Sequence, residues 1–158
     1  MIKTAVLTIS DRASRGEYSD KSGEVIKSMV KDLPAEIVRY EIIPDEPELI
    51  KQKFIEYSDS LKLDLVISSG GTGLGPRDFT PEVTRAIIEK EVPGISEAIR
   101  MEGFKSTRRA ILSRGVAGIR GQTLIINLPG SPRAVQEALS AILEAVRHGV
   151  EMIRGGGH

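Results

Sequence analysis

Hydrophobic residues along the chain fall into short continuous runs and into longer segments in which they recur every three or four positions. The continuous runs are typical of strands buried on both faces, and the wider recurrence is typical of amphipathic helices. The runs that predict strands are residues 4–9, 36–43, 64–68, 116–120 and 123–128. The helical pattern covers residues 23–33, 45–61, 80–88 and 131–153, with a further helical stretch through 97–99 after a break at Pro93-Gly94. Strands alternating with helices predict an α/β fold: a single three-layer α/β/α domain whose mostly parallel sheet is covered on both faces.

Local signals mark where several of these elements begin and end. We expect Thr80 to be the N-cap of its helix, with the following proline as the first helical residue. Ser131-Pro132 opens the closing helix in the same way, and Gly121-Gln122 predicts a tight turn between the last two strands. We therefore expect one folded domain over residues 1–154 and a frayed, flexible tail over residues 155–158.

The composition fits a globular domain with no strong preference for a charged macromolecule. The chain has 158 residues, with 22 basic and 22 acidic side chains and a formal net charge of zero. No strong attraction to nucleic acid or to an anionic membrane is expected, so any phosphate site must be local. The apolar run at residues 4–9 is too short for a signal peptide or a membrane span.

Cysteine and histidine are too scarce to form a metal centre. The sequence has no cysteine, which removes disulfides and thiolate metal sites, and His148 and His158 offer no ligand cluster. We expect His148 to face solvent from the closing helix. The absence of cysteine is compatible with the cytoplasm, which is the location we expect.

The segment from Ser68 to Glu82 carries the strongest chemical signal in the chain. It places four glycines, a cation and two carboxylates after a buried strand, at the strand end where open α/β sheets bind ligands. Backbone N–H groups of these glycines can point at a phosphate, and Arg77 can pair with it. Because Asp78 beside a phosphate would be repelled unless a cation lies between them, the segment predicts bound Mg²⁺.

Two familiar phosphate-binding patterns do not fit this segment. A P-loop requires Lys-Ser or Lys-Thr after its last glycine, but Gly75 is followed by Pro76-Arg77. The Rossmann fingerprint requires a third glycine where this chain has Pro76, and a proline there would disrupt the helix opening. A plain glycine-rich turn without a ligand is the alternative interpretation.

Other candidate residues lie at the ends of predicted strands, and each has a structural alternative. Asp45 stands three positions before Glu48, which is also a capping-box spacing. Asp11 and Arg12 follow the first strand, where they either bind a ligand or simply pair on the surface. The Pro-Gly-Ser-Pro segment at residues 129–132 is either a turn with an N-cap or a second anion site at a helix N-terminus.

Four motifs in this order make the chain resemble a known family. They are Thr8-Ile9-Ser10-Asp11-Arg12, Ile43-Pro44-Asp45-Glu46, the block Gly70-Gly71-Thr72-Gly73 with Arg77-Asp78 and Thr80-Pro81-Glu82, and Asn127-Leu128-Pro129-Gly130-Ser131-Pro132. The chain resembles the molybdopterin adenylyltransferase and molybdenum cofactor biosynthesis protein B family, whose fold also forms the N-terminal domain of gephyrin. The resemblance covers nearly the whole chain. It implies a molybdopterin-binding domain, usually trimeric, that transfers AMP from Mg-ATP to molybdopterin and releases pyrophosphate.

The resemblance also implies roles for individual residues. Asp45 and Asp78 are expected to be catalytic and to hold Mg²⁺, and Ser113 with Arg114 either holds the pterin phosphate or lies exposed on the surface. The other residues expected to bind substrate or nucleotide are Ser10, Asp11, Arg12, Gly70, Gly71, Thr72, Gly73, Gly75, Arg77, Asn127, Pro129, Gly130 and Ser131. The expected partners are ATP, molybdopterin, further copies of the chain in a homotrimer and other molybdenum cofactor biosynthesis proteins, without nucleic acid or membrane.

The chemistry expected of such a site is nucleotidyl transfer, in which the terminal phosphate of molybdopterin attacks the α-phosphate of ATP in line. Positioning and charge neutralisation would be the main tasks, and an ionised phosphate needs no general base, which fits a site without histidine. Two alternatives are a catalytically silent molybdopterin-binding or scaffold relative, and an unrelated Mg-dependent phosphotransferase or phosphatase on an open α/β sheet.

Overall fold

The computed structural model describes residues 1–156, and one six-stranded sheet of order β2-β1-β3-β6-β5-β4 forms its centre. The strands are β1 (Ile2–Ile9), β2 (Ala35–Ile43), β3 (Leu65–Ser69), β4 (Lys90–Glu91), β5 (Ala117–Arg120) and β6 (Thr123–Leu128). β1 runs parallel to β2 and β3, and β3 runs parallel to β6, whereas β5 pairs antiparallel with β6 and β4. The mostly parallel sheet is confirmed, and so is the tight turn between β5 and β6, where Gly121 has a φ of 59°.

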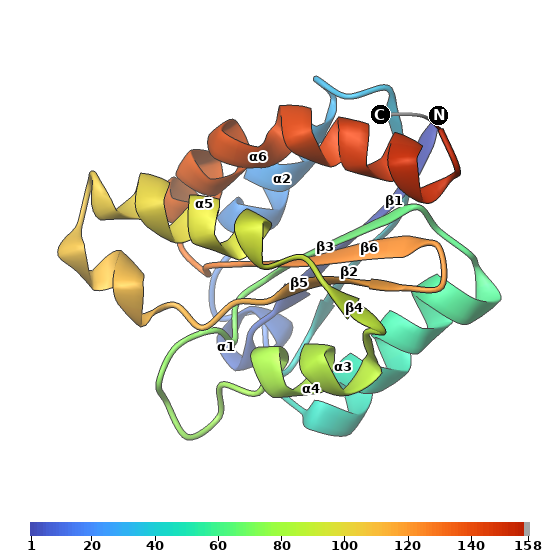
Figure 1. Cartoon of the computed structure of the whole chain (residues 1–158). Coiled ribbons are helices and arrows are strands. Elements are labelled where there is room, and N and C mark those ends of the chain that lie inside the picture. Colours follow the sequence, from blue (N-terminus) through green and yellow to red (C-terminus); the bar gives the residue numbers. More distant parts are fainter. Residues whose placement is uncertain (157–158) are drawn as a thin grey trace.

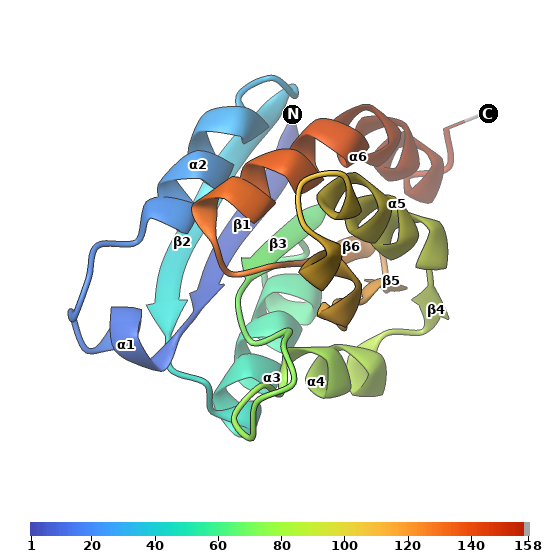
Figure 2. The same ribbon diagram turned by 90° about the vertical axis from the view of Figure 1, so that its left-hand side faces the viewer.

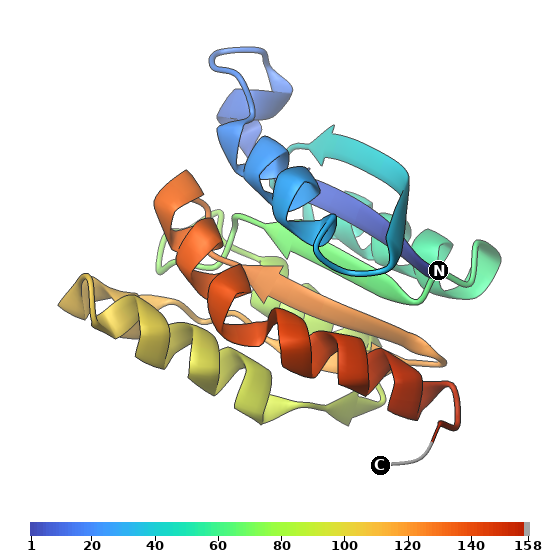
Figure 3. The same ribbon diagram turned by 90° about the horizontal axis from the view of Figure 1, so that it is seen from above.

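Helices cover both faces of this sheet (Figures 1 and 3). α2 (Lys21–Val30), α5 (Pro93–Phe104) and α6 (Pro132–Ile153) lie on one face, and α3 (Pro47–Ile55) and α4 (Thr80–Ile87) lie on the other. Three short helical elements are α1 (Asp11–Ser14), η1 (Glu56–Ser60) and η2 (Arg108–Leu112). The three-layer α/β/α architecture is therefore confirmed. No helix within residues 1–156 is long and apolar enough to cross a membrane.

The hydrophobic core has two halves, one on each side of the sheet. Because side chains alternate along a strand, Leu65 and Ile67 of β3 pack toward α2 and α6, whereas Val66 packs toward α3 and α4. Every residue of β3 is buried, which explains why this strand begins as a continuous apolar run rather than an alternating pattern. The central strand thus holds the start of the glycine-rich loop in a fixed position.

The structure departs from the predicted elements at short segments. The helix expected over residues 45–61 begins at Pro47 and continues into the π-helical turn η1. The sequence pattern does not predict α1, β4 or η2, because elements of two to five residues are too short to show a hydrophobic period.

The predicted N-cap of α4 is wrong by one residue. Phe79 occupies the N-cap position and makes no side-chain cap bond, and Thr80 is already helical. Thr80 Oγ1 donates instead to Gly70 O at 3.1 Å, which ties α4 to the glycine-rich loop. Ser131 is the N-cap of α6, as expected, and its hydroxyl accepts from Ala134 N at 3.2 Å.

The glycines after α6 close that helix. Gly155, at a φ of 90°, donates its N–H to Met152 O, and Gly156 donates to Glu151 O, each at 2.9 Å. This pair of bonds is a Schellman motif, so these two positions are bonded backbone and differ from the frayed tail that we expected. The last two residues of that tail lie outside the described residues, and the domain boundary at residue 154 stays a prediction.

The carboxyl ends of β1, β3 and β6 lie at the same edge of the sheet, because these strands are parallel. Figure 2 shows α1 and the loop after β3 gathered at this edge. Gly70 N donates to Leu128 O at 3.1 Å, which joins the start of that loop to the end of β6. Open α/β sheets bind ligands at this edge, so the candidate site is built here.

Candidate functional site

The glycine-rich loop between β3 and α4 separates two cavities. The larger cavity, of about 460 Å³, extends from this loop to α5, η2 and the start of α6. The smaller cavity, of about 270 Å³, lies over the ends of β1 and β3 and reaches the segment that leads into α2. Gly70, Gly71, Asp78 and Gly130 line both cavities. A ligand in one cavity would therefore meet a ligand in the other at this shared wall.

Gly70 and Gly71 are required by the backbone itself. Their φ angles are 97° and 69°, which favour glycine. A β-carbon on Gly70 would lie 2.2 Å from Ile9 O, and one on Gly71 would lie 2.3 Å from Thr80 Oγ1. The loop therefore passes too close to β1 and α4 for any side chain at these two positions. Such a tightly fixed loop favours a binding loop over a plain glycine-rich turn.

Gly73 and Gly75 have a different reason for being glycine. A β-carbon at either position would lie 2.9 Å from Asp78 Oδ2, which also accepts from Gly75 N at 2.8 Å. The Asp78 carboxylate thus occupies the inside of the loop. We predicted that the N–H groups of all glycines of this loop point at a phosphate. Two of them do not, because Gly70 N donates to Leu128 O and Gly75 N donates to Asp78 Oδ2. Within residues 1–156, the N–H groups from Gly71 to Gly73 have no acceptor and can donate to a ligand.

Arg77 braces the loop and lines neither cavity. Its guanidinium donates to Asp11 at 2.7 and 3.2 Å, to Asp45 O at 3.1 Å and to Glu46 Oε1 at 2.8 Å. The bond from Arg77 lowers the pKa of Asp11, because the carboxylate form accepts it. Protein oxygens already surround the Arg77 guanidinium, its pairing with a phosphate stays a prediction, and Asp11 belongs to the same brace.

Arg114 braces the loop from the opposite side. Its side chain donates to Gly73 O at 2.9 Å and to Asp78 O at 3.0 Å, and it pairs with Glu82. Its backbone N–H also donates to Thr72 O at 2.9 Å. These bonds fix the loop conformation, so Arg114 has a structural role here, and its contact with a pterin phosphate stays a prediction.

Asn127 also lies away from the cavities. Its side chain is buried and bonds Ser68 Oγ at 3.2 Å, Thr84 Oγ1 at 3.0 Å and Val116 N at 3.0 Å. These bonds join β3, α4 and the start of β5 inside the core. Ser131 caps α6 and lines neither cavity. Both predicted binding residues therefore support the site from outside it.

Asp45 faces the smaller cavity and does not cap α3. The N-cap of α3 is Glu46, which makes no side-chain cap bond. Asp45 Oδ2 instead accepts from Asp11 N at 2.9 Å, and Asp45 N donates to Asp11 Oδ1 at 3.0 Å, which joins the ends of β1 and β2. Burial raises the pKa of Asp45, and the negative charges of Asp11 and Asp78 raise it further.

Asp45 and Asp78 form a pair suited to Mg²⁺. Both line the smaller cavity, and their mutual repulsion is the kind that a bound cation relieves. Within residues 1–156 no group of three or more acidic, histidine or cysteine side chains could hold a metal ion. Mg²⁺ does not need such a group, because it is ordinarily held by one or two carboxylates together with substrate phosphates. The residues present therefore fit a magnesium ion that arrives with a nucleotide.

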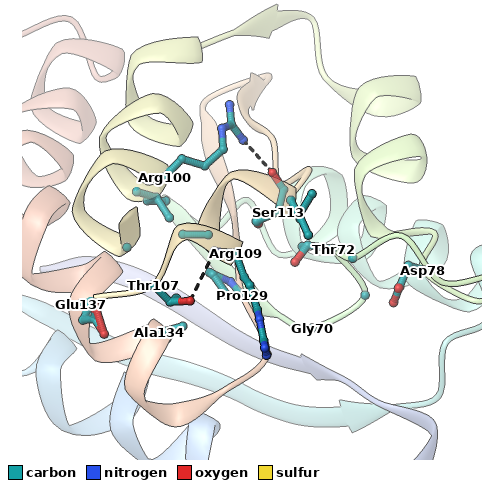
Figure 4. Close-up of a pocket in the computed structure, with 17 residues that line it drawn as sticks. Gly70, Thr72, Asp78, Arg100, Thr107, Arg109, Ser113, Pro129, Ala134 and Glu137 are labelled. Carbon is teal, nitrogen blue, oxygen red and sulfur yellow. Dashed lines mark hydrogen bonds between the residues drawn. The ribbon is translucent and has the colours of Figure 1, made fainter. Parts of the chain in front are cut away.

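Eight of the predicted residues line the larger cavity, and the four beyond the shared wall are Thr72, Gly73, Ser113 and Pro129. The sequence did not point to η2 or its N-cap, from which Thr107 and Arg109 also line the cavity. Figure 4 shows Arg109 extending across the cavity past Pro129. Within residues 1–156 its guanidinium takes part in none of the ion pairs. The basic stretch around η2 was the available signal, but nothing in the sequence showed that it folds over the glycine loop.

The smaller cavity also contains residues that sequence reasoning missed. Asp20 is held by Thr8 Oγ1 at 2.6 Å, Tyr40 Oη at 2.5 Å and Gly23 N at 3.0 Å. Ser69 lines the cavity, and its hydroxyl is buried with no hydrogen-bond partner within residues 1–156. Because buried hydroxyl groups are normally bonded, this unbonded hydroxyl is a candidate partner for a ligand.

Of the remaining predicted residues, Ser10 lies at the smaller cavity and Arg12 lies outside both cavities. Ser10 lines the smaller cavity, where its Oγ accepts from Ala13 N at 3.2 Å and bonds Tyr18 Oη at 2.8 Å. Arg12 lines neither cavity and lies over the Tyr18 ring. His148 is exposed on α6, as expected.

Comparisons with known proteins show which family the chain is similar to. The family model described as "Probable molybdopterin binding domain" matches residues 5–148. A molybdopterin adenylyltransferase from Helicobacter pylori is 44% identical over 157 residues, which cover 98% of this chain and 89% of the relative. The Escherichia coli K12 protein of that description is 38% identical over 156 residues, with 94% and 80% covered. The crystal structure of the molybdopterin biosynthesis enzyme MoaB from Thermus thermophilus superposes with a TM-score of 0.93 and 45% identity, covering 98% of both chains.

Proposed function

The chain belongs to the family of the probable molybdopterin binding domain, and we propose on this basis that it is a molybdopterin adenylyltransferase of molybdenum cofactor biosynthesis. It transfers AMP from ATP to molybdopterin and releases pyrophosphate. The observation that carries this proposal is the wall of Gly70, Gly71, Asp78 and Gly130 that both cavities share. A reaction that joins two substrates requires two sites that meet at the reacting atoms.

We assign molybdopterin to the larger cavity. Ile99, Leu112 and Pro129 give it apolar surface for the pterin ring, and Arg109 supplies an uncommitted cation for the terminal phosphate. We assign the nucleotide to the smaller cavity, where Ser10, Asp20 and Ser22 supply hydroxyl and carboxylate oxygens suited to a ribose. Both phosphates then lie at the shared wall.

The residues of the shared wall act by positioning and by charge. The N–H groups from Gly71 to Gly73 would donate to phosphate oxygens, where negative charge accumulates as the phosphate of molybdopterin attacks the α-phosphorus of ATP. Arg77 and Arg114 keep the loop rigid, so little reorganisation is needed during reaction. Asp45 and Asp78 would hold Mg²⁺, which when bound neutralises charge on the phosphates. The attacking phosphate is already ionised, so no side chain has to remove a proton.

A catalytically silent binding or scaffold relative is the second candidate. The placement of both Asp45 and Asp78 against one cavity favours the enzyme, because a binding protein has no need for two carboxylates that repel each other. We further propose that the enzyme works in the cytoplasm, as a homotrimer, and passes its product to other proteins of the same biosynthesis.

Pyrophosphate release tests the proposal directly. The protein incubated with molybdopterin, ATP and Mg²⁺ should release one pyrophosphate for each adenylylated molybdopterin, and omission of molybdopterin or chelation of Mg²⁺ should stop the release. Binding of molybdopterin without any release of pyrophosphate would identify the protein as the silent relative.

A further inference from the structure

Tyr18 is the one aromatic side chain that lines either cavity within residues 1–156. Aromatic residues are rare in this chain, which has three tyrosines, three phenylalanines and no tryptophan. The other two tyrosines serve the fold, since Tyr40 bonds Asp20 and Tyr57 is fully buried. Both proposed substrates carry a flat heteroaromatic ring, and flat rings bind best against another π-face.

The Tyr18 ring is held in place before any ligand arrives. Its hydroxyl bonds Ser10 Oγ at 2.8 Å, and that oxygen also accepts from Ala13 N at 3.2 Å. The Arg12 guanidinium lies 5.4 Å from the ring centroid and pairs with Glu17 at 3.5 Å. Tyr18 is nevertheless 47% exposed. A fixed and exposed ring loses little conformational entropy when it binds a ligand.

The position of the shared wall determines which part of a nucleotide would reach Tyr18. Phosphates at Gly70, Gly71 and Asp78 leave the nucleoside to extend into the part of the smaller cavity that the larger one does not share. That part is lined by hydroxyl and carboxylate groups and by Tyr18. The polar groups suit the ribose, which leaves the tyrosine ring for the base.

We propose that Tyr18 is the base-stacking residue of the smaller cavity and that Arg12 supports its ring rather than contacting phosphate. The inference deepens the proposed function, because it depends on a nucleotide occupying this cavity. It names the base of the nucleotide as the group that Tyr18 recognises. Stacking accepts any base but favours the larger purine surface.

Three probes and two variants test this proposal. Binding of Mg-ATP, of Mg-tripolyphosphate and of molybdopterin is measured by calorimetry for the wild type, Tyr18→Ala and Tyr18→Phe. Tripolyphosphate carries the phosphates of a nucleotide without its base. Tyr18→Ala should weaken Mg-ATP binding about tenfold or more, as base–aromatic stacking predicts, and should leave tripolyphosphate and molybdopterin unchanged. Tyr18→Phe keeps the ring and loses only the bond to Ser10, so it should restore most of the ATP affinity.

The outcomes separate stacking from other roles. An unchanged affinity of Tyr18→Ala for Mg-ATP would overturn the proposal, and so would equal weakening of ATP and tripolyphosphate, which indicates a general loss of cavity shape. Weakening of molybdopterin alone would place the pterin against Tyr18 and overturn it as well. If the wild type binds ATP but transfers no AMP, the proposed enzymatic function is wrong. The role of Tyr18 is still tested in that case, because the comparison of ATP with tripolyphosphate measures binding alone. A wild type that does not bind Mg-ATP would overturn both.

Discussion

Two neighbouring serines at the end of β3 have opposite surroundings. Ser68 faces α4, where its hydroxyl bonds Asn127 Nδ2 at 3.2 Å. Ser69 faces the other side of the sheet and lines the smaller cavity, with its hydroxyl buried and unbonded within residues 1–156. Alternation along a strand separates them, so they form a matched pair for mutation.

Compared with the wild type, Ser69→Ala should therefore have an equal or slightly higher free energy of unfolding, because it removes a buried hydroxyl that has no partner. It should also weaken Mg-ATP binding, since the ligand loses a hydrogen-bonding group.

Ser68→Ala is the control. It should lower the free energy of unfolding by about 1 kcal/mol and leave ATP affinity unchanged. Urea unfolding and calorimetry measure both quantities. A Ser69→Ala protein that is destabilised like Ser68→Ala, with normal ATP affinity, would show that Ser69 is structural.

Residue types at the site could be predicted from the sequence, but several of their contacts could not. The glycines after β3 and the placement of Asp78 beside them follow from local pattern and from the carboxyl end of a strand. Arg77 and Arg114 have the right charge for phosphate. Their guanidinium groups nevertheless donate to carboxylate and carbonyl oxygens of residues far away in the sequence. The hydrogen-bond partners of these two arginines can be identified only from the folded structure.

At the scale of elements, a partly buried polar contact joins β2 to α3 and to η1. Glu41 accepts from Tyr57 Oη at 2.5 Å and pairs with Lys53 Nζ at 2.7 Å. Burial alone would raise the pKa of Glu41, but the bonds from Lys53 and Tyr57 outweigh it and lower the pKa below the ordinary 4.5. The contact therefore stabilises the fold while Glu41 is ionised.

The stabilisation should depend on pH in one direction. Because the folded-state pKa of Glu41 lies below its unfolded value, the contribution is complete above the unfolded pKa and is lost as pH falls through the folded one. Glu41→Gln should lower the melting temperature near neutral pH, and its difference from the wild type should shrink below about pH 4.5. Glu36→Gln, on the exposed side of β2, is the control and should change little. A difference for Glu41→Gln that is constant with pH would contradict this assignment.

Element prediction succeeded where the hydrophobic period was long and failed where it was absent. α2, α3 and α6 and the five longer strands follow their apolar patterns closely. β4 consists of Lys90 and Glu91, which have no apolar character. It pairs with β5 at the edge of the sheet, and that pairing depends on the fold rather than on a local hydrophobic pattern. η2 has five residues, too few to show a hydrophobic period, so the wall that it adds to the larger cavity could not be inferred from the sequence.

At the scale of the whole molecule, α5 and η2 expose an apolar surface. Met101 is 71% exposed, Phe104 46% and Ile111 63%, and these three side chains line one groove. Scattered exposed apolar residues are ordinary, but a contiguous group of this kind indicates a protein interface. The expected homotrimer gives this surface an occupant, namely a second copy of the chain.

Light scattering at micromolar concentration should therefore give the mass of three chains. Met101→Glu places a charge in the proposed interface and should shift the mass toward that of one chain. Met152→Glu, near the end of α6 and 38% exposed, is the control and should leave the trimer intact. A wild-type mass of one chain would refute the trimer, and equal effects of the two variants would refute this interface.

If two substrates meet at Asp78, the rate of pyrophosphate release should depend on the Asp78 carboxylate. Single-turnover release of pyrophosphate is compared for the wild type, Asp78→Asn and Asp32→Asn, with molybdopterin and Mg-ATP at saturating concentrations verified by binding. Asparagine can still accept from Gly75 N, so the loop should stay folded while Mg²⁺ binding is impaired. Asp78→Asn should then lose about 100-fold or more in rate with molybdopterin affinity nearly intact. Asp32→Asn makes the same substitution at an exposed position outside both cavities, and it should stay close to the wild type. An unchanged rate for Asp78→Asn, or a loss explained entirely by weaker molybdopterin binding, would contradict the claim.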